Sequence, residues 1–407
     1  MKKILFASVV AVMLVGNSLQ AFEAVGTLKD INSERGIIHI YANGQDRIVT
    51  AAKDIRVLGT DGKPLADGLM AKELTNGVEV TITVGNRNKT PIIQGIRLGK
   101  HEADINMGNS GKSSVGLKPL TEMTADDRYK GEDGGLYGRG KNRPPLAHMA
   151  AAQKQTERIV PLDAEGKPSR NGKIGLVSIS MSNATMEYSL FKQIADKDPQ
   201  KSPVVTIVDC AQGGQAMAEW VAPNAPPWME ADRRLERAEV SAKQVQVIWV
   251  KLANKHPQGE LAEHGTKLQM NTMAVLHNAQ ARFPNLRIAY LSSRIYGGYA
   301  STPLNPEPYA YEGAFAVRWL IQAQINGNPD LQYSDANGLA KAPLLLWGPY
   351  FWADGTVPRK SDGLIWERAD LGGDGTHPSD RGLQKVANML LNFFKEDDLA
   401  SKWYLKK

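Results

Sequence analysis

Five residues between positions 182 and 377 are of the types that perform nucleophilic chemistry at a carbonyl group. They are Ser182, Gly214, Asn254, Asp374 and His377. A serine hydroxyl is a weak nucleophile until a neighbouring imidazole accepts its proton. The imidazole in turn needs a carboxylate on its other nitrogen, which fixes the tautomer and stabilises the imidazolium. Asp374 lies three residues before His377, so one loop could hold both side chains side by side.

The remaining two residues could stabilise the charge that develops on a carbonyl oxygen. Backbone N–H groups beside the pair Gly213-Gly214 and the side-chain amide of Asn254 are donors that can bind an oxyanion. Ser182 lies where an apolar strand pattern passes into a helical one. At the start of a helix, free N–H groups and the helix dipole favour negative charge.

Alternating strands and helices are expected to bring these residues together. Five apolar segments indicate strands, at residues 174–179, 204–210, 245–252, 287–291 and 343–347. Amphipathic segments separate or follow them, at residues 186–197, 266–283 and 312–325, and a last helix is expected to begin near Ser379 as N-cap. This alternation predicts a parallel sheet with helices on both faces. Ligands of such sheets bind beyond the carboxyl ends of the strands, where Ser182, Gly214 and Asn254 would lie.

These blocks, in this order, resemble the SGNH (GDSL-type) hydrolase superfamily from residue 173 to the end of the last helix. Ser182 matches the nucleophile, Gly214 (or Gly213) the glycine of the second block, Asn254 the asparagine of the third, and Asp374 with His377 the final D-x-x-H. The resemblance implies a flavodoxin-like αβα sandwich, ester hydrolysis, and an oxyanion hole formed by Ser182, Gly214 and Asn254. Met181 departs from the family pattern, since an aspartate usually precedes the serine, and Lys255 stands where the third block usually has aspartate.

Other residues near the predicted site are candidates for substrate contacts. A segment at 135–148 combines aromatic, basic and amide groups, and it contains Tyr137, Arg139, Asn142 and Arg143. It could fold over the catalytic edge or be a plain surface loop. After the fifth strand, Tyr350 and Trp352 could stack on a sugar or an acyl group, although aromatic residues in such a place are more often part of the core.

Two further residues compete for the role of nucleophile. Ser180 precedes Ser182 by two residues and should share a strand face with Ser178, so we expect it to be structural. Cys210 ends an apolar strand and has no base of its own, which predicts a buried, inert thiol. The aspartates around His377 do not follow a calcium-loop spacing, and no H-E-x-x-H motif occurs, so we expect neither a metal nor another cofactor.

The first residues have the layout of a secretory signal peptide. Lys2 and Lys3 precede an apolar run at 4–15, and small or polar residues follow up to Ala21, so we expect residues 1–21 to direct export and to be removed. Residues 22–100 show short strands and turns, including an Asn43-Gly44 hairpin signal, and predict a small β-barrel-like domain. Residues 101–170 are expected to be a long loop or linker, and residues 171–407 the hydrolase-like domain.

Composition narrows the possible partners. The net charge of +6 is spread along the chain without a basic run, so we expect no nucleic-acid binding. No segment after the signal peptide approaches the roughly 20 apolar residues of a membrane helix, so we expect no stable membrane insertion. Cys210 is the only cysteine, which leaves no intrachain disulfide.

The sequence therefore predicts a secreted or periplasmic serine esterase that acts on small acyl groups, acetyl groups of a polysaccharide in particular. Two alternatives stay open. A polysaccharide O-acetyltransferase would use the same triad with a sugar hydroxyl in place of water. A non-catalytic glycan-binding protein would keep the fold without the chemistry, because function does not follow from fold alone.

Overall fold

The computed structural model describes residues 22–42, 45–87, 90–99, 111–334 and 339–406. The chain forms two compact units, residues 1–109 and 110–407. The expected signal peptide and the Asn43-Gly44 turn lie outside the described residues. No helix of the described ranges is long and apolar enough to cross a membrane.

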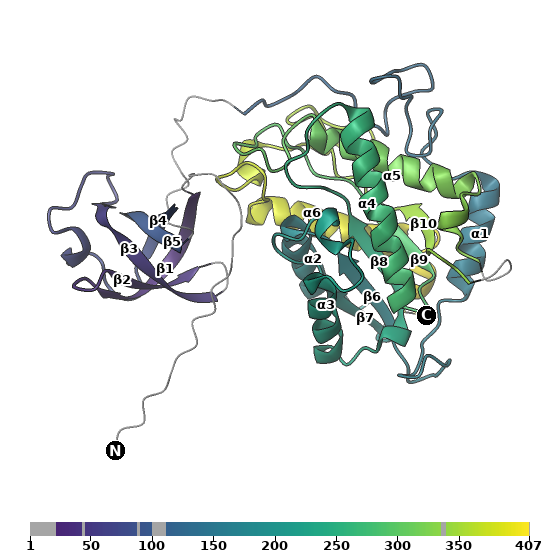
Figure 1. The fold of residues 1–407 in the computed structure, drawn as a ribbon, viewed down its shortest axis with the longest axis horizontal. Helices are drawn as coiled ribbons and strands as arrows, with labels where there is room; N and C mark the ends of the chain where they lie inside the picture. Colours follow the sequence, from purple (N-terminus) through teal and green to yellow (C-terminus); the bar gives the residue numbers. More distant parts are fainter. Residues whose placement is uncertain (1–21, 43–44, 88–89, 100–110, 335–338, 407) are drawn as a thin grey trace. The chain divides into compact units, whose positions relative to one another are not determined.

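The first unit is a closed five-stranded barrel (Figure 1). Its strands are β1 (Phe22–Asn32), β2 (Ile37–Ala42), β3 (Gln45–Leu58), β4 (Glu79–Arg87) and β5 (Thr90–Leu98). They pair in the order β1-β2-β3-β5-β4; β3 and β5 are parallel, and the pairs β1–β2, β2–β3, β4–β5 and β1–β4 are antiparallel. A 3-10 turn, η1 (Gly68–Met70), lies between β3 and β4. The structure therefore has a small all-β unit at the N-terminal side, as predicted.

Alternation along the strands of the barrel separates its interior from its surface. Ile38 and Ile40 of β2 point inward and are almost completely buried, whereas Tyr41 beside them is exposed. Ile40 faces Leu28 across the β1–β2 pair. The interior consists of Leu28, Ile38, Ile40, Val57, Val80, Ile82, Val84, Ile93, Ile96 and Leu98.

The second unit contains a five-stranded parallel sheet. Its strands are β6 (Ile174–Ile179), β7 (Val205–Asp209), β8 (Val245–Lys251), β9 (Ile288–Ser292) and β10 (Leu344–Trp347). Their order is β7-β6-β8-β9-β10, the doubly wound 2-1-3-4-5 order of flavodoxin-like folds. The prediction of five strands is confirmed, with every boundary within one residue. Apart from Thr206 and Asp209, each strand residue is buried, which explains why the strands are continuous apolar runs.

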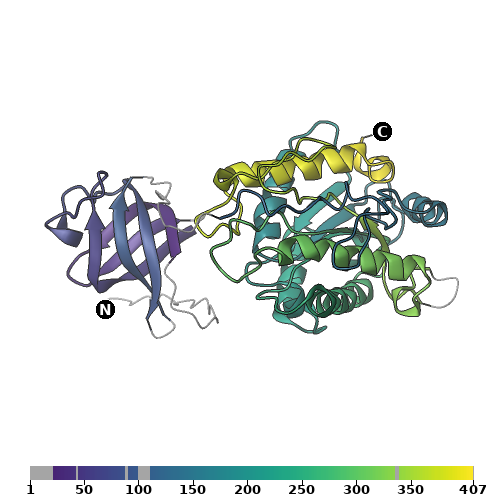
Figure 2. The same ribbon diagram turned by 90° about the horizontal axis from the view of Figure 1, so that it is seen from above.

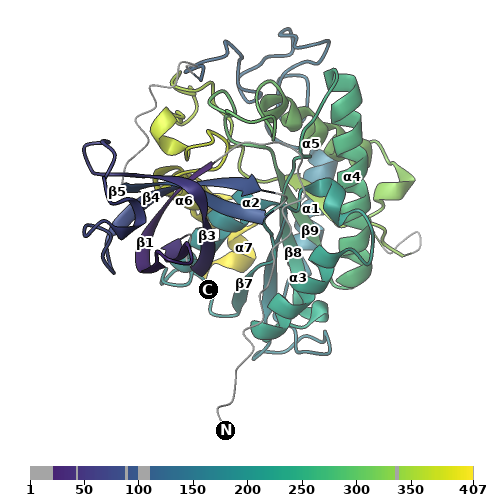
Figure 3. The same ribbon diagram turned by 60° about the vertical axis from the view of Figure 1, so that its left-hand side comes forward.

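Helices cover both faces of this sheet. They are α1 (Leu146–Glu157), α2 (Ser182–Ala195), α3 (Pro226–Arg237), α4 (Leu261–Arg282), α5 (Tyr309–Ile325), α6 (Asp380–Glu396) and α7 (Ser401–Tyr404). The short 3-10 turns in this unit are η2 (Met217–Trp220), η3 (Ala242–Gln244), η4 (Pro329–Leu331) and η6 (Arg368–Asp370). Figures 2 and 3 show α2 and α6 packed together on one side of the sheet and α4 with α5 on the other. Ser379 caps α6, as predicted, by accepting a hydrogen bond from the N–H of Gly382.

Aromatic rings hold α2 and α6 to the sheet. Tyr188 of α2 stacks on Trp249 of β8, with 5.4 Å between the ring centroids. One turn further along α2, Phe191 stacks on Phe394 of α6, also at 5.4 Å. Each ring is fully buried. Stacked pairs of this kind contribute about 0.5–1.5 kcal/mol beyond the area that they bury.

The expectation of a loop or linker over residues 101–170 needs correction. From residue 110 the chain belongs to the second unit, and it includes helix α1. Tyr129 stacks on Phe315 of α5 with a centroid distance of 5.6 Å. Five further side chains enter the second unit's core, namely Leu120, Met123, Leu136, Ala152 and Ile159. Sequence periodicity missed this packing because the apolar residues of an irregular segment are buried one at a time.

A buried ion pair joins α2 to the end of β8. Lys251 Nζ lies 2.6 Å from both carboxylate oxygens of Glu187, and neither side chain is exposed to solvent. Burial raises the pKa of Glu187 and lowers the pKa of Lys251 to about 8, while the attraction between the two groups opposes both shifts. Loss of either partner would therefore leave a buried charge without compensation and destabilise the fold.

We predict that Lys251→Met alone destabilises the second unit by about 3–5 kcal/mol, because it leaves Glu187 buried without its partner. The double variant Glu187→Met/Lys251→Met should recover most of the lost stability, since it removes both charges. Urea unfolding followed by tryptophan fluorescence measures this unit selectively, because all 8 tryptophans lie beyond residue 109. Wild-type stability of the single variant would contradict the prediction.

Candidate active site

The structure brings Ser182, His377 and Asp374 into one hydrogen-bonded chain. Ser182 Oγ lies 2.7 Å from Nε2 of His377, and Nδ1 of the same ring lies 2.6 Å from Oδ2 of Asp374. The imidazole and carboxylate side chains are 30% and 28% exposed, so the chain can be reached from solvent. This is the arrangement in which imidazole accepts the serine proton while a carboxylate holds its other nitrogen.

The Asp374 carboxylate is held in its ionised form. Burial by itself would raise its pKa, but the His377 ring and the backbone N–H groups of Thr376 and His377 outweigh that effect and lower the pKa to about 2. The two backbone donors both lie 3.0 Å from Oδ1. The pKa of Asp374 in the folded state is below the unfolded value of about 3.9. The ionised carboxylate therefore stabilises the folded state fully above pH 4, and this contribution is lost as the pH falls toward 2.

Neighbouring segments fix the loop that carries the two residues. Arg368 donates to the carbonyl oxygens of Leu371, Gly372 and Gly373 at 2.8–3.0 Å. Ser301 donates to the carbonyl oxygen of Asp374 through its N–H (3.0 Å) and its hydroxyl (3.1 Å). The loop is therefore bound on both sides, which restricts the positions that the imidazole can take.

The expected oxyanion donors lie in loops that contact the residue before the nucleophile. Met181, Ala216 and Ala253 form one buried cluster. Met181 immediately precedes Ser182, Ala216 follows Gly214 by two residues, and Ala253 immediately precedes Asn254. The three loops that follow β6, β7 and β8 therefore meet at Met181, as the parallel sheet requires.

Asn254 is oriented by the bonds of its side-chain oxygen. Oδ1 accepts hydrogen bonds from the N–H of Ala218 and from Nδ2 of Asn271, both at 3.2 Å. Among the described residues its amide nitrogen makes no hydrogen bond, and it remains available as a donor. Gly214 is exposed and has a φ of +75°, with nothing within 4 Å of the position a Cβ would take. Its carbonyl oxygen accepts a hydrogen bond from Lys255 Nζ at 2.9 Å. The N–H of Ser182 belongs to the first turn of α2, whose donors have no partner within the helix.

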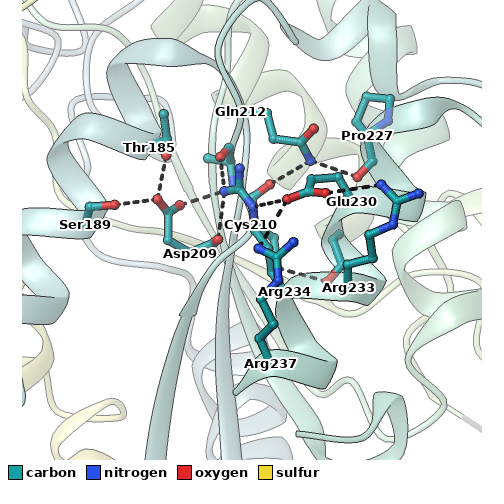
Figure 4. A network of polar contacts seen from close by, with 12 residues as sticks. Thr185, Ser189, Asp209, Cys210, Gln212, Pro227, Glu230, Arg233, Arg234 and Arg237 are labelled. Atoms are coloured by element: carbon teal, nitrogen blue, oxygen red, sulfur yellow. Dashed lines mark hydrogen bonds and ion pairs between the residues drawn. The ribbon is translucent and has the colours of Figure 1, made fainter. Parts of the chain in front are cut away.

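A polar network supports the segment that precedes the glycine pair (Figure 4). Asp209 at the end of β7 accepts hydrogen bonds from Thr185 Oγ1 (2.5 Å) and Ser189 Oγ (2.7 Å), both on α2. Arg234 of α3 donates to the carbonyl oxygens of Asp209 (3.0 Å) and Ala211 (2.8 Å). Hydrogen bonds therefore connect the end of β7 and the loop after it to both α2, which begins at Ser182, and α3.

The competing nucleophiles have structural positions. Ser180 is fully buried and its hydroxyl donates to the carbonyl oxygen of Lys251, between neighbouring strands. Cys210 is fully buried, and burial raises the pKa of its thiol. Both findings agree with the expectations from the sequence. No group of three or more metal-ligating side chains occurs in the part of the chain that the structure describes.

Four predicted substrate contacts lie in the segment 135–148, and the structure joins none of them to the triad by a described hydrogen bond or ion pair. The hydroxyl of Tyr137 accepts a hydrogen bond from the N–H of Trp347 at the end of β10, at 3.4 Å. Asn142 closes its own loop, since Oδ1 accepts from Leu136 N and Nδ2 donates to Thr121 O. Arg139 and Arg143 are exposed.

The prediction that Tyr350 and Trp352 contact substrate needs correction, because both rings belong to the core. Trp352 is 0% exposed, and its indole N–H donates to Oε1 of Glu307 at 2.7 Å. Tyr350 is 5% exposed, and its hydroxyl accepts a hydrogen bond from the N–H of Leu120. Part of this burial comes from the irregular segment after residue 110, whose packing has no periodic pattern in the sequence.

Arg294, which lies just beyond β9, was not among the residues predicted from the sequence. Its side chain is 2% exposed and touches the turns of both the serine and the histidine. Its position in the sequence could have identified it. Ligands bind beyond the carboxyl ends of parallel strands, and Ser292-Ser293-Arg294 stands at the end of the fourth strand.

No protein-family model matches the sequence, and no curated protein matches it. Among solved structures, a "putative acylhydrolase" from Bacteroides fragilis is 13% identical, with 61% of this chain and 97% of that chain covered and a TM-score of 0.32. The periplasmic domain of a lipopolysaccharide acetyltransferase from Salmonella ser. Paratyphi A is 12% identical, with 55% and 83% covered and a TM-score of 0.31. Apo-CusF from Escherichia coli is 15% identical, with 21% and 93% covered and a TM-score of 0.16. At such scores, the geometry of the site has to carry the functional conclusion.

The geometry predicts that Asp374→Asn slows the reaction of Ser182 with a fluorophosphonate probe by about 10²–10⁴-fold, because the amide cannot stabilise the imidazolium or hold the required tautomer. The labelling rate is measured by mass spectrometry of the Ser182 peptide. Asp380→Asn is the matched control, since Asp380 is exposed in the first turn of α6. Equal labelling of the Asp374→Asn variant and the wild type would contradict the assignment.

Proposed function

We propose that the protein is an exported serine esterase that removes small acyl groups, acetyl groups in particular, from a carbohydrate. The observation that carries the proposal is the chain from Ser182 Oγ to His377 Nε2 (2.7 Å) and from His377 Nδ1 to Asp374 (2.6 Å). A serine, an imidazole and a carboxylate in this geometry, at the carboxyl edge of a parallel sheet, are the parts that acyl transfer requires.

In the first half of the proposed reaction, Ser182 Oγ attacks the ester carbonyl carbon while His377 accepts the hydroxyl proton. The carbonyl oxygen becomes an oxyanion that the N–H groups of Ser182 and Gly214 and the amide of Asn254 stabilise. When the bond between carbon and the alcohol oxygen breaks, His377 gives its proton to the leaving alcohol. The product is an acyl-serine and a free alcohol.

In the second half, water takes the place of the alcohol. His377 accepts a proton from the water, whose oxygen attacks the acyl carbon, and the oxyanion forms again between the same donors. Breaking the bond to Ser182 Oγ returns the proton from His377 to the serine and releases the carboxylic acid. Asp374 stays ionised throughout and stabilises the imidazolium in both halves.

Transfer instead of hydrolysis is the first alternative, because a sugar hydroxyl could accept the acyl group by the same steps. Product analysis with an acetylated donor and an oligosaccharide acceptor separates the two, since only transfer yields a newly acetylated acceptor. The second alternative is a non-catalytic glycan-binding protein. Covalent labelling of Ser182 by a fluorophosphonate would exclude it.

Export is inferred from the signal-peptide pattern of the first residues, with Lys2 and Lys3 before the apolar run and Ala21 at its expected end.

We predict that Ser182→Ala loses turnover of short-chain aryl esters and acetylated sugars while keeping the fold, because only the nucleophile is removed. Release of the aryl alcohol measures turnover, and circular dichroism with tryptophan fluorescence checks the fold. Ser180→Ala is the matched control and should keep activity of the same order, since Ser180 donates to a strand carbonyl. Wild-type activity in Ser182→Ala would refute the proposed nucleophile.

We also predict that Asn254→Ala lowers kcat by about 10²–10³-fold with a smaller effect on KM, because the amide acts on the charge that develops in the transition state. Steady-state kinetics with an aryl acetate measure both constants. Asn271→Ala provides a comparison, since Asn271 only orients the Asn254 oxygen and should cost less. A purely KM effect for Asn254→Ala would contradict a role in the oxyanion hole.

A further inference from the structure

Arg294 is a buried cation that contacts both sides of the proposed active site. It follows β9, and its side chain is 2% exposed. Nη1 lies 3.9 Å from the sulfur of Met181, the residue before the nucleophile. Nη2 donates to the carbonyl oxygen of Thr376, the residue before the proposed base, at 3.2 Å.

The Thr376 carbonyl oxygen is also bound from the nucleophile side. Asn183 Nδ2, in the residue that follows Ser182, donates to the same oxygen at 2.9 Å. One peptide oxygen next to His377 is therefore held by two donors, one from the first turn of α2 and one from the segment after β9. This junction fixes the separation between the serine and the imidazole, which no single element could determine.

The charge of Arg294 has no direct partner. None of the ion pairs among the described residues includes Arg294, and its Nε is buried without a hydrogen bond. The charged groups that act on it or on its neighbours come from four elements: Glu187 of α2, Lys251 of β8, Glu307 before α5, and Asp374 with His377 in the histidine loop. A buried guanidinium without a paired carboxylate costs stability, so fold stability alone does not explain this residue.

We propose that Arg294 is a positioning residue of this esterase, which sets the distance between the serine turn and the histidine loop by holding the carbonyl oxygen of Thr376. The proposal rests on the proposed function.

The test compares three variants by kcat and KM on an aryl acetate. Arg294→Met removes the hydrogen bond and the charge. It should lower kcat about 10–100-fold with a smaller effect on KM, as expected for a displaced catalytic group.

Two further variants test whether the hydrogen bonds at the Thr376 oxygen, and not the charge of Arg294, set kcat. Asn183→Ala removes the other donor to that oxygen without changing charge, so kcat should also fall. Arg294→Lys keeps the charge and loses the planar fork, so it should behave like Asn183→Ala. Arg294→Lys also keeps the proposal falsifiable if Arg294→Met does not fold, which circular dichroism will show.

Each outcome is decisive. If the wild type neither hydrolyses esters nor reacts with a fluorophosphonate, the proposed function fails before Arg294 is considered. If the wild type is active, wild-type kcat in Arg294→Lys and Asn183→Ala overturns the positional role. A change confined to KM in these variants overturns it as well.

Discussion

The parallel pairing of β6 with both of its neighbours is the constraint on which the site depends. β6 pairs with β7 so that Ser178 lies opposite Asp209, and it pairs with β8 so that Ile179 lies opposite Val250. This register places the ends of three strands level with one another. The loops that follow therefore start from one line, and Met181 can touch residues of the other two. The order of the sheet reverses at β6, which is where doubly wound folds bind ligands.

Several charged side chains near the carboxyl edge of this sheet are buried. The Glu187–Lys251 pair has no exposure and Arg294 has almost none, while Glu307 accepts hydrogen bonds from Gly297, Tyr311 and Trp352. Electrostatic interactions are stronger where water is excluded. A small change in one of these groups is therefore felt at the triad, and the groups rigidify the loops that meet there.

The loops around the site are fixed by hydrogen bonds from side chains that take no part in the proposed chemistry. Arg368 binds the histidine loop, Arg234 binds the loop after β7, and Asn271 orients Asn254. Acyl transfer requires donors that are in place before the oxyanion forms, because reorganising them during the reaction would raise the barrier. The guanidinium groups suit this task, since each can donate to more than one carbonyl oxygen.

The sequence by itself determined the strands of the second unit, the parallel architecture and the residues at the strand ends, because burial on both faces and helical periodicity are local patterns. It also placed Asp374 beside His377, since three residues separate them. The tertiary structure alone decided that Ser182 Oγ reaches His377, that Tyr350 and Trp352 are covered, and that residues 111–170 pack into the core. It also revealed Arg294, whose contacts at Met181 and Thr376 are 113 and 82 residues away. Contacts of that kind depend on how irregular segments fold over one another, and no periodic pattern in the sequence encodes them.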